Sequence, residues 1–504
     1  MPKIAFIPND PLAGTKAPPL RKKAKRKNRP AARASFALPS APAEDVFEPG
    51  TQEFLFWQCR EASLAALAAW ETFAGPHLRW QGNRKKIQLV PDAGDDLNAF
   101  YDRTSVSFFH HDIGSKTYFS GNSTDVVAHE VGHGLLDTIR PDLWDASFLE
   151  AGAFHEAFGD CIALLTAFSD ATTRRKLLEN GSLRKRNFVE STAEELSEAV
   201  KRIAPNNNSA APRHALNSFK YQLPSSLPFD GPPGHLINEV HSFGMVFSGC
   251  IWDLLAQIFA STAGKSADLL KAAKTTGKLL VEGSKAAPLT SRFFQSVGRS
   301  MVLADETLNA GANHEHITRA FQKHGILLGS NAMLAPTIAL AGSAPTGGSL
   351  DASTKKDLIK RLGGGRATRV SSASSELFGK PVTRAVLHKE IDLSSVHRAL
   401  KGVFVQVDVP VMIGESGSRA ALVGAAPEPV ATEEEVQTFV RSLVEQDQIE
   451  WPTQRVVGAT RRTANTNTHG RAKGAVKLAR SQTTHTIATI KGTKVLKRVR
   501  FHCF

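Results

Sequence analysis

The stretch DVVAHEVGHGLLDTI at residues 125–139 contains the pattern His-Glu-x-x-His, in which the histidines are His129 and His133. On a helix, residues four positions apart lie on one face, so both imidazoles can reach one metal ion while Glu130 contacts a water on that ion. The apolar periodicity of the stretch, and the hydroxyl residues just ahead of it that can cap a helix, predict a helix here. The same pattern also arises by chance, so a third metal ligand has to be identified.

A second helical stretch, GAFHEAFGD at residues 152–160, supplies that ligand. A metzincin has a glycine three residues after the second histidine and its third histidine three residues further on. Here those two positions hold Leu136 and Ile139, so the metzincin class is excluded. Glu156 and Asp160 instead lie four residues apart on one helical face, in an Ala- and Gly-rich apolar background. We predict that Glu156 binds the ion and that Asp160 holds the free ring nitrogen of a ligand histidine.

These two motifs together resemble the thermolysin-like zinc metallopeptidases, and further segments extend the resemblance over roughly residues 52–328. Those segments are NAFYD (98–102), which is similar to the family's edge strand, the lead-in DVVA (125–128), EVHSFG (239–244), and the closing stretches RSMVLAD (299–305) and AFQKHGI (320–326). The combination is more specific than the zinc motif alone.

The resemblance implies a catalytic role for each matched residue. The ligands of one catalytic zinc ion would be His129, His133 and Glu156. Glu130 would be the general base and then the proton shuttle to the leaving amine, and His241 would stabilise the oxyanion. The protein would then be a zinc endopeptidase that cleaves internal peptide bonds.

The resemblance also implies where a peptide would bind. Asn98 and Ala99, on the segment similar to the family's edge strand, would hold an extended substrate through backbone and side-chain groups. Arg213 lies in the polar loop upstream of His241, where the family places a substrate-binding arginine.

The chain departs from the family in two places. No tyrosine lies around Ser147 and Phe148, where the family has one that assists the oxyanion, so stabilisation would rest more heavily on His241. Asp125 matches one calcium ligand of the family, but the residues after Asp160 lack the expected acidic cluster. Because calcium needs about six to eight oxygen ligands, the sequence does not support a calcium site.

The sequence predicts an α+β protein. For residues 51–328, the resemblance implies a small mixed lobe with a β-sheet, a mostly helical lobe after it, and the zinc site between them. The alternation in VFVQVDVPVMI (403–413) predicts a strand, within a small α+β region at residues 351–452. The remaining segments are predicted to be a disordered basic tail at 1–50, a linker at 329–350 and a basic C-terminal segment at 453–504.

The formal net charge of +14 is concentrated at the two ends of the chain. Residues 1–43 carry ten Lys/Arg and one acid, and residues 453–504 carry twelve Lys/Arg and no acid, which leaves −7 for the rest. Since the predicted zinc site lies in the acidic middle, the positive charge does not bear on catalysis. Basic ends of this kind can bind an anionic partner nonspecifically, but no nucleic-acid-binding motif accompanies them.

Cysteine usage and hydropathy narrow the class of protein further. The four cysteines are far apart and form no CxxC pair, so neither a disulfide scaffold nor a cysteine-type zinc site is expected. The amino terminus, MPKIAFIPND, has no apolar stretch of signal-peptide length, and no uninterrupted apolar run approaches the roughly 20 residues needed to span a membrane. We therefore expect a protein without a transmembrane segment, either cytoplasmic or exported by a non-standard route.

A different function consistent with these residues is a zinc-containing scaffold that binds partners without cleaving them. Glu130 argues against it, because a structural zinc ion has no need of that carboxylate and usually has four protein ligands. The endopeptidase is the favoured hypothesis.

Overall fold

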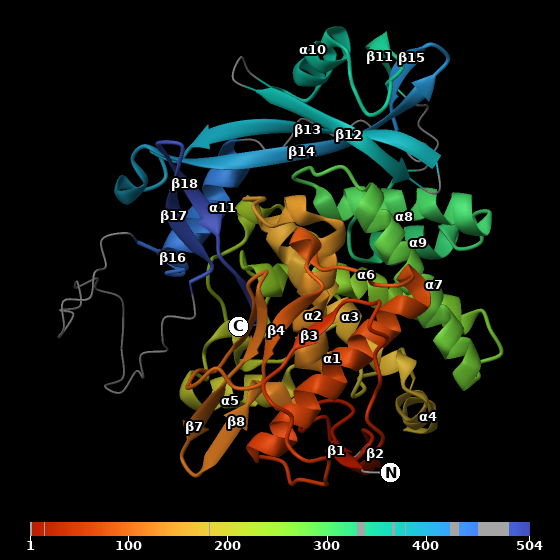
Figure 1. Ribbon diagram of the computed structural model, residues 1–504, viewed down its shortest axis with the longest axis vertical. Coiled ribbons are helices and arrows are strands. Elements are labelled where there is room, and N and C mark those ends of the chain that lie inside the picture. The colour runs from red at the N-terminus through yellow and green to blue at the C-terminus, as the bar shows by residue number, and fades with distance from the viewer. Residues whose placement is uncertain are drawn as a thin grey trace.

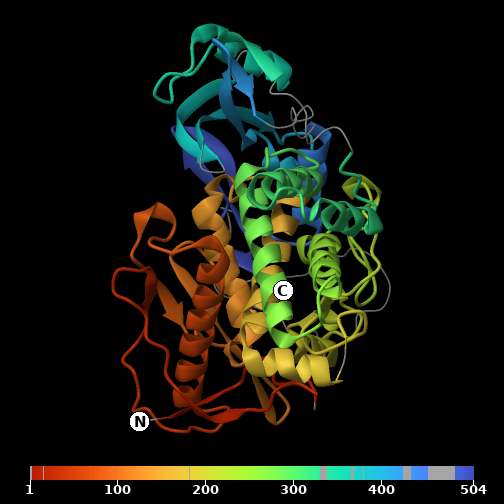
Figure 2. The same ribbon diagram turned by 90° about the vertical axis from the view of Figure 1, so that its right-hand side faces the viewer.

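The computed structural model describes residues 3–14, 16–180, 182–329, 338–364, 368–377, 380–423, 433–451 and 483–503. Within these residues the protein is α+β, as predicted. A helical part that holds the candidate site lies below a sheet-rich part (Figures 1 and 2). The helices are α1 (Gln52–Ala74), α2 (Thr124–Ile139), α3 (Leu149–Ser169), α4 (Ala171–Asn180), α5 (Glu194–Ile203), α6 (Val240–Ala260), α7 (Ser266–Ala286), α8 (Phe293–Asn309), α9 (His314–Lys323), α10 (Ala352–Arg361) and α11 (Glu433–Glu445).

The described strands form two larger sheets and three two-stranded ribbons. One larger sheet has the order β19-β5-β6-β4-β3, with β3 (Ser35–Ala37), β4 (Lys86–Val90), β5 (Ala99–Tyr101), β6 (Ser105–Phe108) and β19 (Phe501–His502). The other has eight strands, which are β11 (Ile338–Ser343), β12 (Arg369–Leu377), β13 (Lys380–Asp392), β14 (Val403–Ser416), β15 (Arg419–Leu422), β16 (Ile449–Glu450), β17 (His485–Ile490) and β18 (Thr493–Arg498). The ribbons pair β1 (Ile4–Phe6) with β2 (Arg21–Ala24), β7 (His110–Ile113) with β8 (Lys116–Phe119), and β9 (Ser191–Thr192) with β10 (Arg213–His214).

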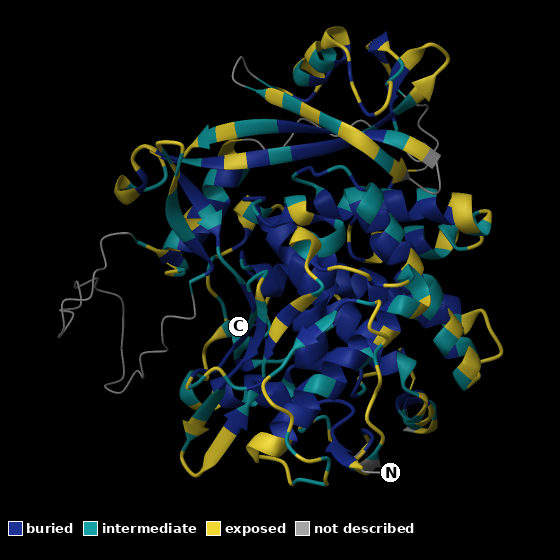
Figure 3. Ribbon diagram, viewed as in Figure 1, coloured by how far each residue is buried: buried dark blue, intermediate teal, exposed yellow. Residues whose placement is uncertain are grey.

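Helices α2, α3 and α6 form the core of the helical part, and Figure 3 shows them as almost wholly buried. Every residue of α3 from Leu149 to Phe168 is buried. Among the described residues, α6 is the one helix long and apolar enough to cross a membrane, but 78% of its apolar stretch is buried inside the protein. Burial on all sides by neighbouring elements accounts for this apolar composition.

Helices α2 and α3 approach each other closely where glycine faces glycine. A methyl group added to Gly132 would lie 2.9 Å from the Cα atom of Gly159, which is closer than carbon atoms can pack. A methyl group added to Gly159 would lie 2.7 Å from Nδ1 of His129. The two glycines thus bring the helices together and leave room for a histidine ring between them.

The amino-terminal segment differs from the expectation of a disordered tail over residues 1–50. Strands β1 and β2 pair with each other, and β3 joins the five-stranded sheet beside β4. Some of its arginines pair with acids of the helical part, for example Arg29 with Glu71 at 3.1 Å and Arg21 with Asp170 at 2.6 Å. A count of like charges along the sequence cannot reveal these partners, because they are distant in the chain.

The predicted strand at 403–413 is confirmed as β14, which pairs with β13 along ten residue pairs. Of the predicted linker at 329–350, residues 330–337 lie outside the described residues, and Ile338–Ser343 forms β11. In the predicted basic segment at 453–504, residues 453–482 and 504 are not described. The described remainder forms β17, β18 and β19, and its last strand reaches the helical part (Figure 1).

Glu150, in the first turn of α3, ties three elements together. Its carboxylate accepts hydrogen bonds from the Tyr221 hydroxyl at 2.7 Å and from the backbone N–H of Phe294, in the first turn of α8, at 2.9 Å. Burial raises the pKa of Glu150 to about 7, even though these donors and Arg292 favour the ionised form.

The variant Glu150→Gln should gain stability relative to the parent as the pH rises from about 4.5 to 7. In this window the folded parent keeps a proton on Glu150 that the unfolded chain has already lost, so raising the pH destabilises the folded parent. Glutamine can still accept from Phe294 and donate to the Tyr221 oxygen. The difference in unfolding free energy, measured by denaturant titration, should grow by about 3 kcal/mol across the window. A difference that does not change with pH would contradict the assignment.

Candidate active site

The His-Glu-x-x-His residues lie in the middle of α2, as predicted, and all three side chains are fully buried. Ligand atoms of His129, Glu130 and His133 lie within 4.8 Å of one another. Burial lowers the pKa of His133 to about 3, which keeps its ring neutral and able to donate a lone pair.

Glu156, on α3, reaches the same point from the facing helix. Its Oε2 atom lies 3.2 Å from Nε2 of His129 and 3.7 Å from Nε2 of His133. The structure therefore brings together the three residues predicted as metal ligands.

The donor atoms at this point fit a zinc ion. Two imidazole nitrogens and one carboxylate oxygen are ligands that zinc prefers, and three protein ligands are typical of a catalytic site. Nε2 of His133 and both carboxylate oxygens of Glu130 are buried and have no hydrogen-bond partner among the residues that the structure describes. Because buried polar atoms are rarely left without a partner, these atoms mark a place where a cation and a water can bind.

Asp160 lies one turn beyond Glu156 and holds the other nitrogen of His129. Its Oδ1 atom is 2.9 Å from Nδ1 of His129 and 3.0 Å from Nη2 of Arg213. Although burial opposes ionisation, Arg213 and His129 hold the pKa of Asp160 down at about 2. A permanently ionised Asp160 keeps the proton of His129 on Nδ1, which leaves Nε2 free for the metal.

His133 has a corresponding neighbour that was not predicted as a site residue. Nδ1 of His155 lies 3.2 Å from Nδ1 of His133, so one ring donates to the other. Burial lowers the pKa of His155 well below its usual value, which makes it a neutral partner.

His241, in the first turn of α6, also faces Glu156. Its Nε2 atom is 3.1 Å from Oε2 of Glu156, and its Nδ1 atom is 2.6 Å from Oε1 of Glu239. Glu239 is the N-cap of α6 and accepts hydrogen bonds from the backbone N–H groups of His241 and Ser242. Despite burial, the two glutamates raise the pKa of His241 well above its usual value, so its ring carries the proton that a donor needs.

The predicted substrate-binding residues line the same site. Ala99, in β5, offers its backbone carbonyl to the N–H of Cys503 at 2.9 Å, and Asn98 is buried directly before it. Arg213, in β10, donates from Nη1 to the carbonyl of Cys503 at 2.9 Å and from Nη2 to Asp160. The C-terminal residues of the chain thus lie in the place predicted for a substrate.

Glu239, His155 and the C-terminal residues 501–503 were missed by reasoning from the sequence. For Glu239 a signal existed, because an acid two residues before a histidine at a helix start can cap the helix and hold the ring. For residues 501–503 no local pattern connects the end of the chain with a strand some 400 residues earlier.

Asp125, the residue that matches a calcium ligand of the family, lies beside Asp10 and Glu194. Carboxylate oxygens of the three residues lie within 4.8 Å of one another. Burial raises the pKa of each of them, and the neighbouring charges raise the pKa values of Asp10 and Glu194 further. Three carboxylates alone do not make a calcium site, since that ion takes about six to eight oxygens.

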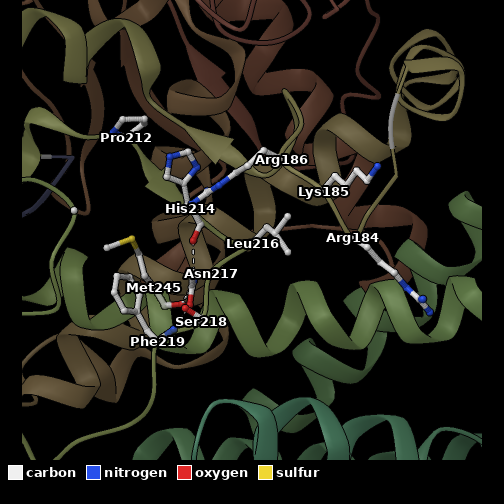
Figure 4. A pocket seen from close by; sticks show the side chains of 11 residues that line it. Arg184, Lys185, Arg186, Pro212, His214, Leu216, Asn217, Ser218, Phe219 and Met245 are labelled. Carbon is white, nitrogen blue, oxygen red and sulfur yellow. Dashed lines mark hydrogen bonds between the residues drawn. The ribbon is translucent and has the colours of Figure 1, made fainter.

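A pocket of about 420 Å³ opens beside β10, on the loop that precedes α6 (Figure 4). Its lining includes the basic side chains of Arg184, Lys185 and Arg186 together with His214. None of the predicted zinc ligands and catalytic residues lines it. It is therefore separate from the candidate active site.

Comparison with known families agrees with the geometry. Residues 105–332 match the family model of the fungalysin metallopeptidases (M36). Fungalysins are thermolysin-like zinc metallopeptidases, so the match confirms the resemblance found in the motifs and supports a zinc metalloprotease that acts on proteins or peptides. No curated protein matches the chain.

The variant Asp160→Asn should bind zinc about 10–100-fold more weakly than the parent, because an amide no longer fixes the tautomer of His129. Competition with a chromogenic chelator would measure the affinity. Asp253→Asn is a matched control, since Asp253, on α6, contacts a histidine at the end of α9 (His324, at 3.1 Å) and lies outside this site. Equal zinc affinities for Asp160→Asn and the parent would argue against the positioning role of Asp160.

Proposed function

We propose that the protein is a zinc-dependent metalloendopeptidase that hydrolyses internal peptide bonds. The observation that carries the proposal is the convergence of ligand atoms from two facing helices around a buried glutamate without a hydrogen-bond partner. The converging ligands are His129, His133 and Glu156, and the glutamate is Glu130. A structural metal site has no need of such a carboxylate, whereas a hydrolase needs one to take a proton from water. The family match supports the same class of enzyme.

The proton transfers can be assigned to residues of this chain. When bound, zinc would polarise the scissile carbonyl and lower the pKa of a bound water. Burial raises the pKa of Glu130 to about 8, and a divalent cation nearby favours its ionised form, so it can accept a proton from that water. Glu130 then passes the proton to the leaving nitrogen as the peptide bond breaks.

His241 would stabilise the negative charge that develops on the carbonyl oxygen. Its Nε2 atom already donates to a peptide carbonyl, that of His502, at 2.6 Å. Glu239 holds the opposite ring nitrogen and keeps the ring protonated. A donor fixed in advance in a buried site stabilises an oxyanion more strongly than water does.

An extended peptide would bind along the edge of β5 on which β19 lies, taking the place of that strand in the sheet. The carbonyl of Ala99 would accept from a substrate N–H, and Arg213 would donate to a substrate carbonyl, with Asn98 at the start of the strand. The charge of Arg213 is already matched by Asp160, so Arg213 suits an internal carbonyl better than a terminal carboxylate. The Arg213–Asp160 pair therefore favours cleavage of internal bonds over carboxypeptidase activity.

The variant Glu130→Gln should retain bound zinc but lose peptide hydrolysis by about 10²–10⁴-fold, because glutamine cannot accept the proton of the attacking water. The measurement is the kcat for a fluorogenic peptide that is blocked at both ends, with zinc content measured on the same samples. The exposed Glu306→Gln is a matched control and should keep the parent's rate. Unchanged hydrolysis by Glu130→Gln would exclude Glu130 as the base.

A further inference from the structure

The C-terminal end of the chain leaves the sheet-rich part and enters the candidate active site. After β18 the chain runs from the sheet-rich part toward the C-terminus beside the helical part (Figure 1). There β19 pairs with β5 in antiparallel register. Phe501 pairs with Tyr101, and His502 pairs with Phe100. The edge of β5 that a substrate would use is therefore already occupied by a strand of the same chain.

The backbone of this segment contacts the groups assigned to substrate binding and catalysis. The His502 carbonyl accepts from Nε2 of His241, and the next N–H, of Cys503, donates to the carbonyl of Ala99. The carbonyl of Cys503 in turn accepts from Arg213. Consecutive groups on both sides of the His502–Cys503 peptide bond are thus held as the proposed enzyme would hold a substrate around its scissile bond.

Side chains fix the segment in this register. The ring of Phe501 is 1% exposed and stacks on His155, with ring centroids 3.9 Å apart, and on His133 at 5.0 Å. Trp144 packs against it in a T-shaped arrangement, with ring centroids 5.4 Å apart. Upstream, Arg498 and Trp144 exchange hydrogen bonds between their side chains and backbone carbonyls.

The segment leaves little access for another peptide. Phe501, His502 and Cys503 are all at least 97% buried. The segment contacts His133, on α2, and pairs with β5. A ligand on the same chain is present at an effective concentration of roughly millimolar, so a free peptide must compete with it.

We infer that the C-terminal segment Arg498–Cys503 is an intramolecular peptide ligand that occupies the substrate groove in substrate register and blocks other peptides. The consequence of this occupancy is that the intact chain is held in a low-activity state, and that consequence rests on the proposed function. Occupancy of the groove itself can be tested without any catalysis.

Accessibility of the Cys503 thiol measures occupancy directly. All four cysteines are buried. In folded Glu130→Gln protein, which should not process itself, iodoacetamide followed by peptide mapping should leave Cys503 unmodified. Phe501→Ala in the same background removes the ring that anchors the segment and should expose Cys503 alone. Continued protection of Cys59, Cys161 and Cys250 would show that the fold is intact. Rapid modification of Cys503 without the Phe501 substitution would overturn the inference.

Activity measures the consequence. A chain that ends at Arg500 keeps β17 and β18 but lacks the occupant of the groove. Its kcat/KM for a peptide blocked at both ends should exceed that of the full-length protein by about tenfold or more, as expected when a roughly millimolar internal competitor is removed. Equal kcat/KM values for the two chains would overturn the inference and leave the proposed function standing.

Two further outcomes are informative. If neither chain cleaves peptides but Cys503 is protected until Phe501 is replaced, the proposed function fails and occupancy of the groove stands.

If the zinc-loaded parent loses its last two residues, water has added across the His502–Cys503 bond to give a carboxyl on His502 and an amine on Cys503. Such a loss, absent in Glu130→Gln, would support the register because it requires that bond at the catalytic groups.

Discussion

The close approach of α2 and α3 at Gly132 and Gly159 is the constraint on which the site depends. The three candidate metal ligands from two helices can meet only if the helices pass near each other, and a single methyl group at either glycine would hold them apart. Gly244 plays a similar part where α6 packs on α3, because a methyl group there would lie 2.8 Å from the carbonyl of Ala153. Through that contact His241 comes within reach of Glu156.

Burial of so many ionisable groups is tolerated because they are paired. Asp160 lies between His129 and Arg213, and Glu239 holds His241, so buried charges of opposite sign offset each other. The same chain of contacts links the candidate metal site to the proposed peptide groove, since Arg213 contacts both Asp160 and the carbonyl of Cys503. The buried polar atoms without partners on Glu130 and His133 are therefore conspicuous, and they lie where the chemistry would occur.

The parts of the fold and site that could be predicted from sequence were those with a local pattern. His129 and His133 share a helical face, and Glu156 and Asp160 repeat that spacing on the next helix. The helices therefore followed from periodicity, and the candidate ligands followed from the motif spacing together with the family resemblance. The α+β class and the strand at 403–413 followed in the same way.

Contacts between distant parts of the chain were not predictable by this route. The amino-terminal basic run was expected to be disordered because its acid partners, such as Glu71 and Asp170, are far away in sequence. The entry of residues 501–503 into the groove depends on how two parts of the fold pack together, and no motif encodes that arrangement. In both cases tertiary contacts neutralise or bury residues whose local composition indicates solvent exposure.

X-ray absorption at the zinc edge of the purified protein would test the central claim most directly, because it reports the atoms bound to the metal. The account predicts nitrogen and oxygen neighbours at about 2.0–2.2 Å from His129, His133 and Glu156, with no sulfur. The nearby thiol of Cys503 makes that distinction meaningful, since the structure places it beside Arg213 and not among the ligand atoms. Protein without zinc, or a sulfur neighbour at about 2.3 Å, would contradict the account.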